Sequence, residues 1–170
     1  MDYGLREWRI TDAPELARFL SNKNILDKLR DGPTFPYSVK DAEAYIVQLL
    51  ASVPGSSFCF AVTDNDKAIG NIGAFRGNNI HSQTAELGYY LDEEYWGKGI
   101  ITNGVKDVCN HIFRNTDIIR IYAEPFADNI ASCRVLEKCG FTCEGILRQN
   151  AIKNGVIKDM KMYSLLKEKL

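Results

Sequence analysis

The sequence predicts a mixed α/β domain in which helices flank a mainly antiparallel central sheet. Strand-like segments follow one another between residues 57 and 91 with only short polar turns between them, which is typical of an antiparallel meander. A glycine-containing turn and a long amphipathic helix then run to Phe113. No internal repeat, linker or low-complexity segment interrupts the chain, so one domain is expected over residues 1–170.

The N-terminal segment predicts a short strand and a helix. The strand is expected over residues 5–10. Asp12 is the expected N-cap of the first helix, and Glu15 follows three residues later. Residues 22–37 are expected to be irregular because glycine and proline breakers interrupt them.

The next segment predicts a second helix and the meander. Ser38 and Asp41 form a capping box, and the helix ends near Leu50. Gly70 and Gly73 indicate a bulge or a close backbone approach in the middle strand. The three strands are expected over residues 57–63, 67–76 and 84–91.

The C-terminal third predicts a crossover and a final hairpin. Residues 118–123 are almost entirely apolar, and the helical crossover before them predicts pairing parallel to residues 84–91. Another helix begins near Asn129 and ends at Gly140, which suits a left-handed C′ position. The last two strands are expected over residues 141–149 and 158–166, with a hinge at residues 153–155.

Composition excludes several classes of function. The formal net charge is −1 with no basic block, so nucleic-acid binding is not expected. No apolar run approaches the ~20 residues that cross a membrane, and the N-terminus has no apolar signal core, so a cytoplasmic location is expected. The five cysteines include no CxxC pair and there are only two histidines, so reduced, packed thiols and no metal are expected.

The turn at residues 95–100 has the features of an anion site. The first turn of a helix has amide groups without intrahelical partners, and Gly97 and Gly99 let the backbone approach an anion closely. Neither the P-loop pattern nor GxGxxG is present, which argues against a nucleoside-triphosphate or dinucleotide site. A turn that merely needs glycine is the alternative, although the strand–turn–helix order favours phosphate.

Two motifs resemble those of the GNAT superfamily of acyl-CoA N-acyltransferases. The segment from Glu94 to Gly99 is similar to the family's [QR]xxGx[GA] pyrophosphate loop, with Glu94 departing from the first position. The segment from Asn129 to Phe141 is similar to the family's NxxSxxxLEKxGF pattern. The whole chain most resembles the ribosomal-protein N-terminal acetyltransferases. That group also contains enzymes that act on polyamines, amino acids and antibiotics, so the acceptor stays open.

The resemblance implies acetyl-CoA as cosubstrate. It implies that the backbone from Tyr89 to Leu91 pairs with the pantetheine arm, and that a Tyr89 or Leu91 amide stabilises the oxyanion. Lys98 either adds charge or is simply solvated. The amides implied in pyrophosphate binding are those of Trp96, Gly97, Lys98, Gly99, Ile100, Ile101 and Thr102.

The implied reaction is direct attack of a primary amine on the thioester. A protein N-terminal amine has a pKa of about 7.7–8.0 and needs only a modest base. Glu86 is the first candidate, an outward surface carboxylate being the alternative, and Glu124 is a weaker rival. The resemblance also implies that Asn129 contacts the cofactor and that Ser132 protonates the leaving thiolate. Both residues are equally typical of a helix N-terminus.

The acceptor site is expected between residues 22–37 and the last hairpin. Phe35 and Tyr37 either form its wall or simply pack, and Asn150 stands where some relatives have a second acid. The leading hypothesis is a protein N-terminal acetyltransferase. Acetylation of a small amine and a CoA-binding module without turnover are the alternatives. Exposed tyrosines and a terminal strand are compatible with a homodimer.

Overall fold

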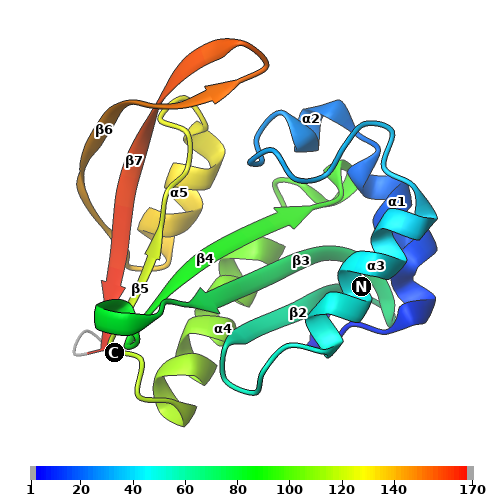
Figure 1. Ribbon diagram of the computed structural model, residues 1–170, viewed down its shortest axis with the longest axis horizontal. Coiled ribbons are helices and arrows are strands. Elements are labelled where there is room, and N and C mark those ends of the chain that lie inside the picture. The colour runs from blue at the N-terminus through cyan, green and yellow to red at the C-terminus, as the bar shows by residue number, and fades with distance from the viewer. Residues whose placement is uncertain (1–2, 168–170) are drawn as a thin grey trace.

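The computed structural model describes residues 3–167, so Met1, Asp2 and residues 168–170 lie outside the described part. It contains one seven-stranded sheet in the order β1-β2-β3-β4-β5-β7-β6, which confirms the predicted mixed class (Figure 1). The strands are β1 (Tyr3–Arg6), β2 (Ser57–Asp64), β3 (Lys67–Arg76), β4 (Thr84–Leu91), β5 (Arg120–Ala123), β6 (Thr142–Lys153) and β7 (Val156–Leu166).

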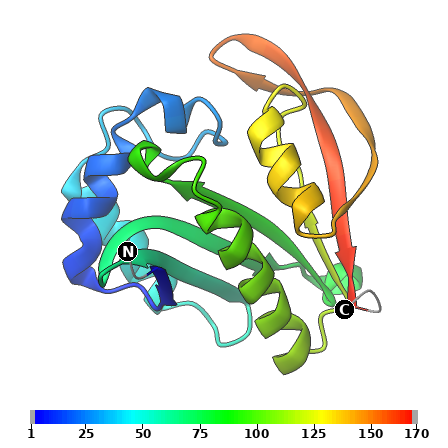
Figure 2. The same ribbon diagram turned by 180° about the vertical axis from the view of Figure 1, so that it is seen from behind.

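Helices cover both faces of the sheet. They are α1 (Ala13–Leu20), α2 (Lys23–Leu26), α3 (Val39–Leu50), α4 (Ile100–Asn115) and α5 (Ile130–Lys138), with 3-10 turns η1 (Ile10–Asp12), η2 (Asn79–His81) and η3 (Glu93–Tyr95). Helices α1 and α3 lie on one face, as Figure 1 shows, and α4 lies on the other, as Figure 2 shows. One buried cluster joins α4, α5 and the central strands, and a second joins α1 and α3 to the sheet.

The predicted meander and parallel crossover are both confirmed. Strands β2, β3 and β4 pair antiparallel, and β4 pairs parallel with β5. That parallel pairing covers only Thr84 with Arg120, Ala85 with Ile121 and Glu86 with Tyr122. Beyond Glu86 the two strands diverge, so the sheet opens like a V between them (Figure 1). The predicted site residues of β4 lie along this opening.

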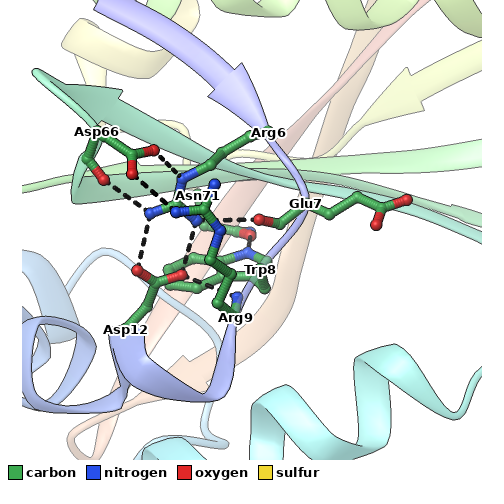
Figure 3. Close-up of polar contacts among 7 residues, drawn as sticks. All are labelled: Arg6, Glu7, Trp8, Arg9, Asp12, Asp66 and Asn71. Atoms are coloured by element: carbon green, nitrogen blue, oxygen red, sulfur yellow. Dashed lines mark hydrogen bonds and ion pairs between the residues drawn. The ribbon is translucent and has the colours of Figure 1, made fainter.

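The first strand is shorter than predicted. Strand β1 ends at Arg6, whereas the sequence predicted a strand over residues 5–10. The chain leaves the sheet because Trp8 is buried, and its indole Nε1 donates to Asn71 Oδ1 at 2.9 Å (Figure 3). Burying this large side chain with its N–H satisfied outweighs continued strand pairing.

Asp12 is the N-cap residue of α1, as predicted, but its side chain does not cap the helix. Its backbone is helical and its side chain makes no capping bond to α1. Instead its carboxylate accepts from both terminal nitrogens of Arg6 at 2.8 Å, and from the Arg9 amide at 2.8 Å (Figure 3). A two-pronged bond to a guanidinium is stronger than a single neutral cap, which explains the exchange.

Other local predictions are confirmed. Ser38 and Asp41 form the capping box of α3. Gly140 has φ +87°, and Phe141 donates to the carbonyl of Leu136, which is a Schellman end for α5. The predicted close approach occurs at Gly70, where a Cβ would lie 2.6 Å from a backbone oxygen of β4.

The last hairpin is longer than predicted. The two strands continue to the turn, where Lys153 pairs with Val156. Asn154 and Gly155 both have positive φ, 51° and 76°, which gives a two-residue turn that keeps the strands paired. The hairpin tip therefore reaches the end of the molecule that carries α2 (Figure 1).

Candidate active site

The turn before α4 presents a row of free amide groups. Gly97 and Gly99 have φ of +76° and +77°, a conformation that favours glycine. Within the described chain, the amides of residues 97–102 have no hydrogen-bond acceptor. The sequence analysis also assigned the Trp96 amide to pyrophosphate binding. That amide is not free, because it already donates to the Glu93 carbonyl at 3.1 Å at the end of η3. Free amide donors at the positive end of a helix are the features that favour anion binding.

Aromatic and cationic side chains frame this turn. The Trp96 indole donates to the Leu91 carbonyl at 2.8 Å, which fixes the turn to the end of β4. The Lys28 ammonium lies over the Trp96 ring at 4.2 Å, and that of Lys98 lies over the Tyr95 ring at 4.8 Å. Two positive charges therefore lie over aromatic rings of this turn. Of the remaining predicted residues here, Ile100 and Ile101 are buried and Thr102 is half-buried.

Two predicted site residues meet across the opening. The hydroxyl groups of Tyr89 on β4 and Ser132 on α5 share a hydrogen bond of 2.9 Å. The Tyr89 hydroxyl also donates to the Ser132 carbonyl at 3.1 Å. Burial raises the pKa of Tyr89, so its hydroxyl keeps its proton at neutral pH. The pair therefore links β4 to α5 through hydroxyl groups that carry protons.

Asn129 occupies the N-cap of α5. Its side-chain oxygen accepts from the Ser132 amide at 3.3 Å, so the structural alternative for this residue is realised. The cap orients the first turn of α5 and with it the Ser132 hydroxyl. Contact between Asn129 and a cofactor stays a prediction.

The two candidate bases share one cation. Glu86 lies on β4, on the opposite face from Tyr89, and Glu124 lies just beyond the end of β5. Arg30 Nη2 forms an ion pair with Glu86 and another, at 3.1 Å, with Glu124. Burial, followed by the charges of these two carboxylates, raises the pKa of the neighbouring Tyr122. The carboxylates thus form one negative site.

Space is available beside these carboxylates. Gly88 is exposed, and a Cβ added there would meet nothing within 4 Å. Strand alternation places it on the same face as Glu86. A cavity of about 280 Å³ lies next to Glu124, lined also by Arg30, Asp31, Asn150, Lys153 and Met160. The hairpin closes it, because Lys153 pairs with Asp31 at 2.7 Å and Asn154 donates to Asp27 at 2.9 Å.

The predicted wall residues lie elsewhere than this cavity. Phe35 is 55% exposed, with the Lys23 ammonium 4.9 Å from its ring centre. Tyr37 packs against the cluster of α1 and α3. Their role as an acceptor wall stays a prediction. A larger cavity of about 630 Å³ lies between β1, β2 and α4, but Glu86, Tyr89 and Ser132 do not line it.

The cysteines are free thiols, as predicted. Burial raises the pKa of both Cys59 and Cys109 to about 12, and that of Cys139 to about 11, so these thiols stay protonated at neutral pH and are poor nucleophiles. Over residues 3–167, no cluster of three or more potential metal ligands is found. The same residues include no helix long and apolar enough to span a membrane.

The acetyltransferase (GNAT) domain family matches residues 3–142 of the chain. The chain belongs to the GNAT acetyltransferase family. The probable N-acetyltransferase YjcK of Bacillus subtilis is 38% identical over 109 residues, 64% of this chain and 60% of that protein. The chain thus spans less than two thirds of that relative's length.

Two further similarities concern ribosomal proteins. The ribosomal-protein-serine acetyltransferase of Escherichia coli is 28% identical over 144 residues, which cover 84% of this GNAT chain and 80% of that protein. A solved structure described as RimL, a ribosomal L7/L12 alpha-N-protein acetyltransferase in complex with coenzyme A, superposes with a TM-score of 0.87. Its sequence is 26% identical, and the match covers 96% of this chain and 93% of the RimL chain.

Sequence reasoning about this GNAT chain missed two candidate site residues, Arg30 and Gly88, and one side-chain role, that of the Tyr89 hydroxyl. Arg30 gave no signal because it lies in an irregular segment, far in sequence from both carboxylates. Gly88 looked like an ordinary strand glycine. The Tyr89 hydroxyl was missed because only its backbone was considered. The NxxS motif did mark Ser132, but nothing local indicated which strand would face it.

Proposed function

We propose that this protein transfers the acetyl group of acetyl-CoA to a primary amine. The observation that carries the proposal is the opening between β4 and β5, which has the Tyr89–Ser132 pair on one side and the Glu86–Glu124 pair on the other. A thioester lying in this opening would meet a proton donor and a proton acceptor on opposite sides. That is the arrangement aminolysis needs.

The cofactor end of the proposed site is the turn before α4. The amides of residues 97–102 and the charges of Lys28 and Lys98 would bind the pyrophosphate. The splayed half of β4, from Tyr89 to Leu91, would bind the pantetheine arm along its backbone. The RimL structure with bound coenzyme A supports this choice of cosubstrate.

The proposed reaction needs three proton transfers. Glu86 takes a proton from the ammonium of the acceptor, directly or through a water. The amine nitrogen then forms its bond to the thioester carbon, and a Tyr89 or Leu91 amide stabilises the oxyanion. When the C–S bond breaks, the thiolate takes a proton from the Ser132 hydroxyl. The second proton of the attacking nitrogen passes through water to the Ser132–Tyr89 pair, so both hydroxyls are restored.

We propose a protein N-terminal amine as the acceptor. The two ribosomal-protein acetyltransferases that the chain resembles over most of their length support this choice. The low pKa of an N-terminal amine suits a single carboxylate base, because Asn150 supplies no second acid. Such an acceptor fits the predicted cytoplasmic location. A homodimer stays a prediction.

A small polyamine is the second candidate. Glu86 and Glu124 converge on one cation, which suits an acceptor with several positive charges. A spermidine N(1)-acetyltransferase of Vibrio cholerae is 29% identical over 111 residues, 65% of this chain and 64% of that protein.

Thiol release from acetyl-CoA tests the proposal. The panel contains peptides beginning with Ser, Ala or Met, together with spermidine and free amino acids. Release with peptides is the expected result, and release with small amines alone would select the second candidate. Calorimetric binding of acetyl-CoA without release for any acceptor would indicate a CoA-binding module instead.

A further inference from the structure

Arg30 brings one nitrogen atom to both candidate bases. Its Nη2 forms ion pairs with Glu86 of β4 and with Glu124 after β5, at 3.1 Å for the second. These three residues come from separate parts of the chain and meet where the two strands begin to diverge. A nitrogen between two carboxylates is also the arrangement that a primary ammonium group would adopt there.

The exposed fractions of the three side chains indicate which of them can move away from the other two. The Arg30 side chain is 59% exposed, whereas those of Glu86 and Glu124 are 30% and 20% exposed. The two carboxylates lie on or next to strands of the sheet. Arg30 lies in the segment after α2, and only the guanidinium at the end of its side chain reaches them. Exposed ion pairs of this kind are weak, so the guanidinium can be exchanged for another cation.

We infer that Arg30 occupies the ammonium position of the acceptor and that every acceptor must displace it. The inference rests on the proposed function and adds a residue that sets acceptor affinity. Without a cation between them, the two neighbouring carboxylates would repel each other. In the absence of an acceptor, the Arg30 guanidinium therefore stays between them. An arginine is suited to this role because its guanidinium cannot be deprotonated and therefore cannot become the nucleophile.

The consequence is a competition inside the site. The apparent affinity for an acceptor is reduced by the fraction of molecules in which Arg30 holds the carboxylates. An acceptor that arrives protonated replaces one cation with another, and it then loses its proton to Glu86. A neutral amine has no charge with which to replace the guanidinium, so the site selects the charged form.

The neighbouring residue provides a matched control. Asp31 is 76% exposed and pairs with Lys153 of the hairpin at 2.7 Å. This pair holds the same segment over the cavity but touches neither Glu86 nor Glu124. The substitution Asp31→Asn therefore loosens the segment without emptying the carboxylate site, whereas Arg30→Gln empties the site.

The test is steady-state thiol release with a serine-initiated peptide and with spermidine. We expect Arg30→Gln to lower the acceptor KM roughly three- to thirtyfold, which corresponds to the loss of two exposed ion pairs, while the KM for acetyl-CoA stays as it is. Asp31→Asn should change the acceptor KM much less. Adding Glu124→Gln to Arg30→Gln should remove the gain.

An unchanged or higher acceptor KM in Arg30→Gln would overturn the inference, and so would an equal decrease in Asp31→Asn. The proposed function fails separately, if no variant and no acceptor releases thiol. In that case calorimetric titration of spermidine into the free protein still tests the role of Arg30. Tighter binding of spermidine by Arg30→Gln than by the unchanged protein supports the inference, and equal binding refutes it.

Discussion

At the scale of single residues, the Tyr89–Ser132 hydroxyl pair links the strand that would hold the thioester to the helix that would face it. Removing either hydroxyl removes the same proton path, so the effects of the two substitutions should overlap. We expect Tyr89→Phe and Ser132→Ala each to lower kcat by roughly tenfold to a hundredfold, and the double variant to lose little more.

The rate of thiol release at saturating substrates measures this prediction. Ser132→Ala keeps the backbone amide that donates to Asn129, so the cap of α5 is retained. Losses that multiply in the double variant would show that the two hydroxyls act independently.

A second residue-scale prediction concerns the positive φ of the turn. Gly99 and Gly55 have φ of +77° and +79°, and a Cβ at either position would meet no atom within 4 Å. Substitution by alanine should therefore cost each position about 1 kcal/mol of backbone strain. Only Gly99→Ala should raise the KM for acetyl-CoA, because only Gly99 orients the amides before α4. Denaturation and initial-rate measurements on the two variants check this, and an equal KM change in Gly55→Ala would contradict it.

At the scale of secondary-structure elements, Glu144 ties three strands together. Its carboxylate on β6 accepts from both terminal nitrogens of Arg120 on β5, at 2.7 and 2.6 Å, and from Ser164 on β7 at 2.6 Å. Hydrogen bonds from Arg120, followed by that from Ser164, lower the pKa of Glu144 from 4.5 to about 2. The folded state therefore favours the ionised carboxylate.

The pH dependence follows from this direction. The stabilisation is fully present above pH 4.5, the ordinary pKa, and is lost as the pH falls toward 2. Because the Glu144 side chain is 40% exposed, Glu144→Gln should lower the free energy of unfolding by only about 1 kcal/mol at pH 7. Urea denaturation at pH 7 and near pH 2 measures it, with Glu43→Gln, an exposed carboxylate of α3, as control. A difference that persists at pH 2 would refute this origin.

At the scale of the whole molecule, the opening of the V separates two halves of one sheet. Strands β4 and β5 share only three residue pairs, while α4 and α5 complete the contact through one buried cluster. A ligand that contacts both the turn before α4 and Ser132 of α5 would add contacts across this junction. Ligand binding to the folded state alone stabilises it by mass action.

Acetyl-CoA should therefore raise the melting temperature. At a hundredfold excess over its Kd, we expect about 2.7 kcal/mol, which for a chain of this size corresponds to roughly 5–10 °C. Differential scanning fluorimetry with acetyl-CoA, with desulfo-CoA and with adenine alone measures the effect. A shift with adenine equal to that with acetyl-CoA would show that the arm and the thioester do not span the opening.

The elements of this protein could be predicted from sequence wherever the cause was local. Periodicity predicted the meander and the long helix, Ser38 and Asp41 predicted a capping box, and Gly140 predicted a helix end. Asp12 is the N-cap residue as predicted, but its side chain does not cap the helix because Arg6 competes for the same carboxylate. Local capping rules do not include that partner.

The sequence by itself determined the GNAT family through two local motifs, the glycine turn before the long helix, and the residue types of the candidate site, because each of these is encoded within a few neighbouring positions. Only the tertiary structure decided which side chains meet. Tyr89 reaches Ser132, and Arg30 reaches Glu86 and Glu124, across separations of 43 to 94 residues. Such pairs depend on how strands diverge and where a loop crosses them, which is set by packing of the whole chain and is not encoded in any one segment.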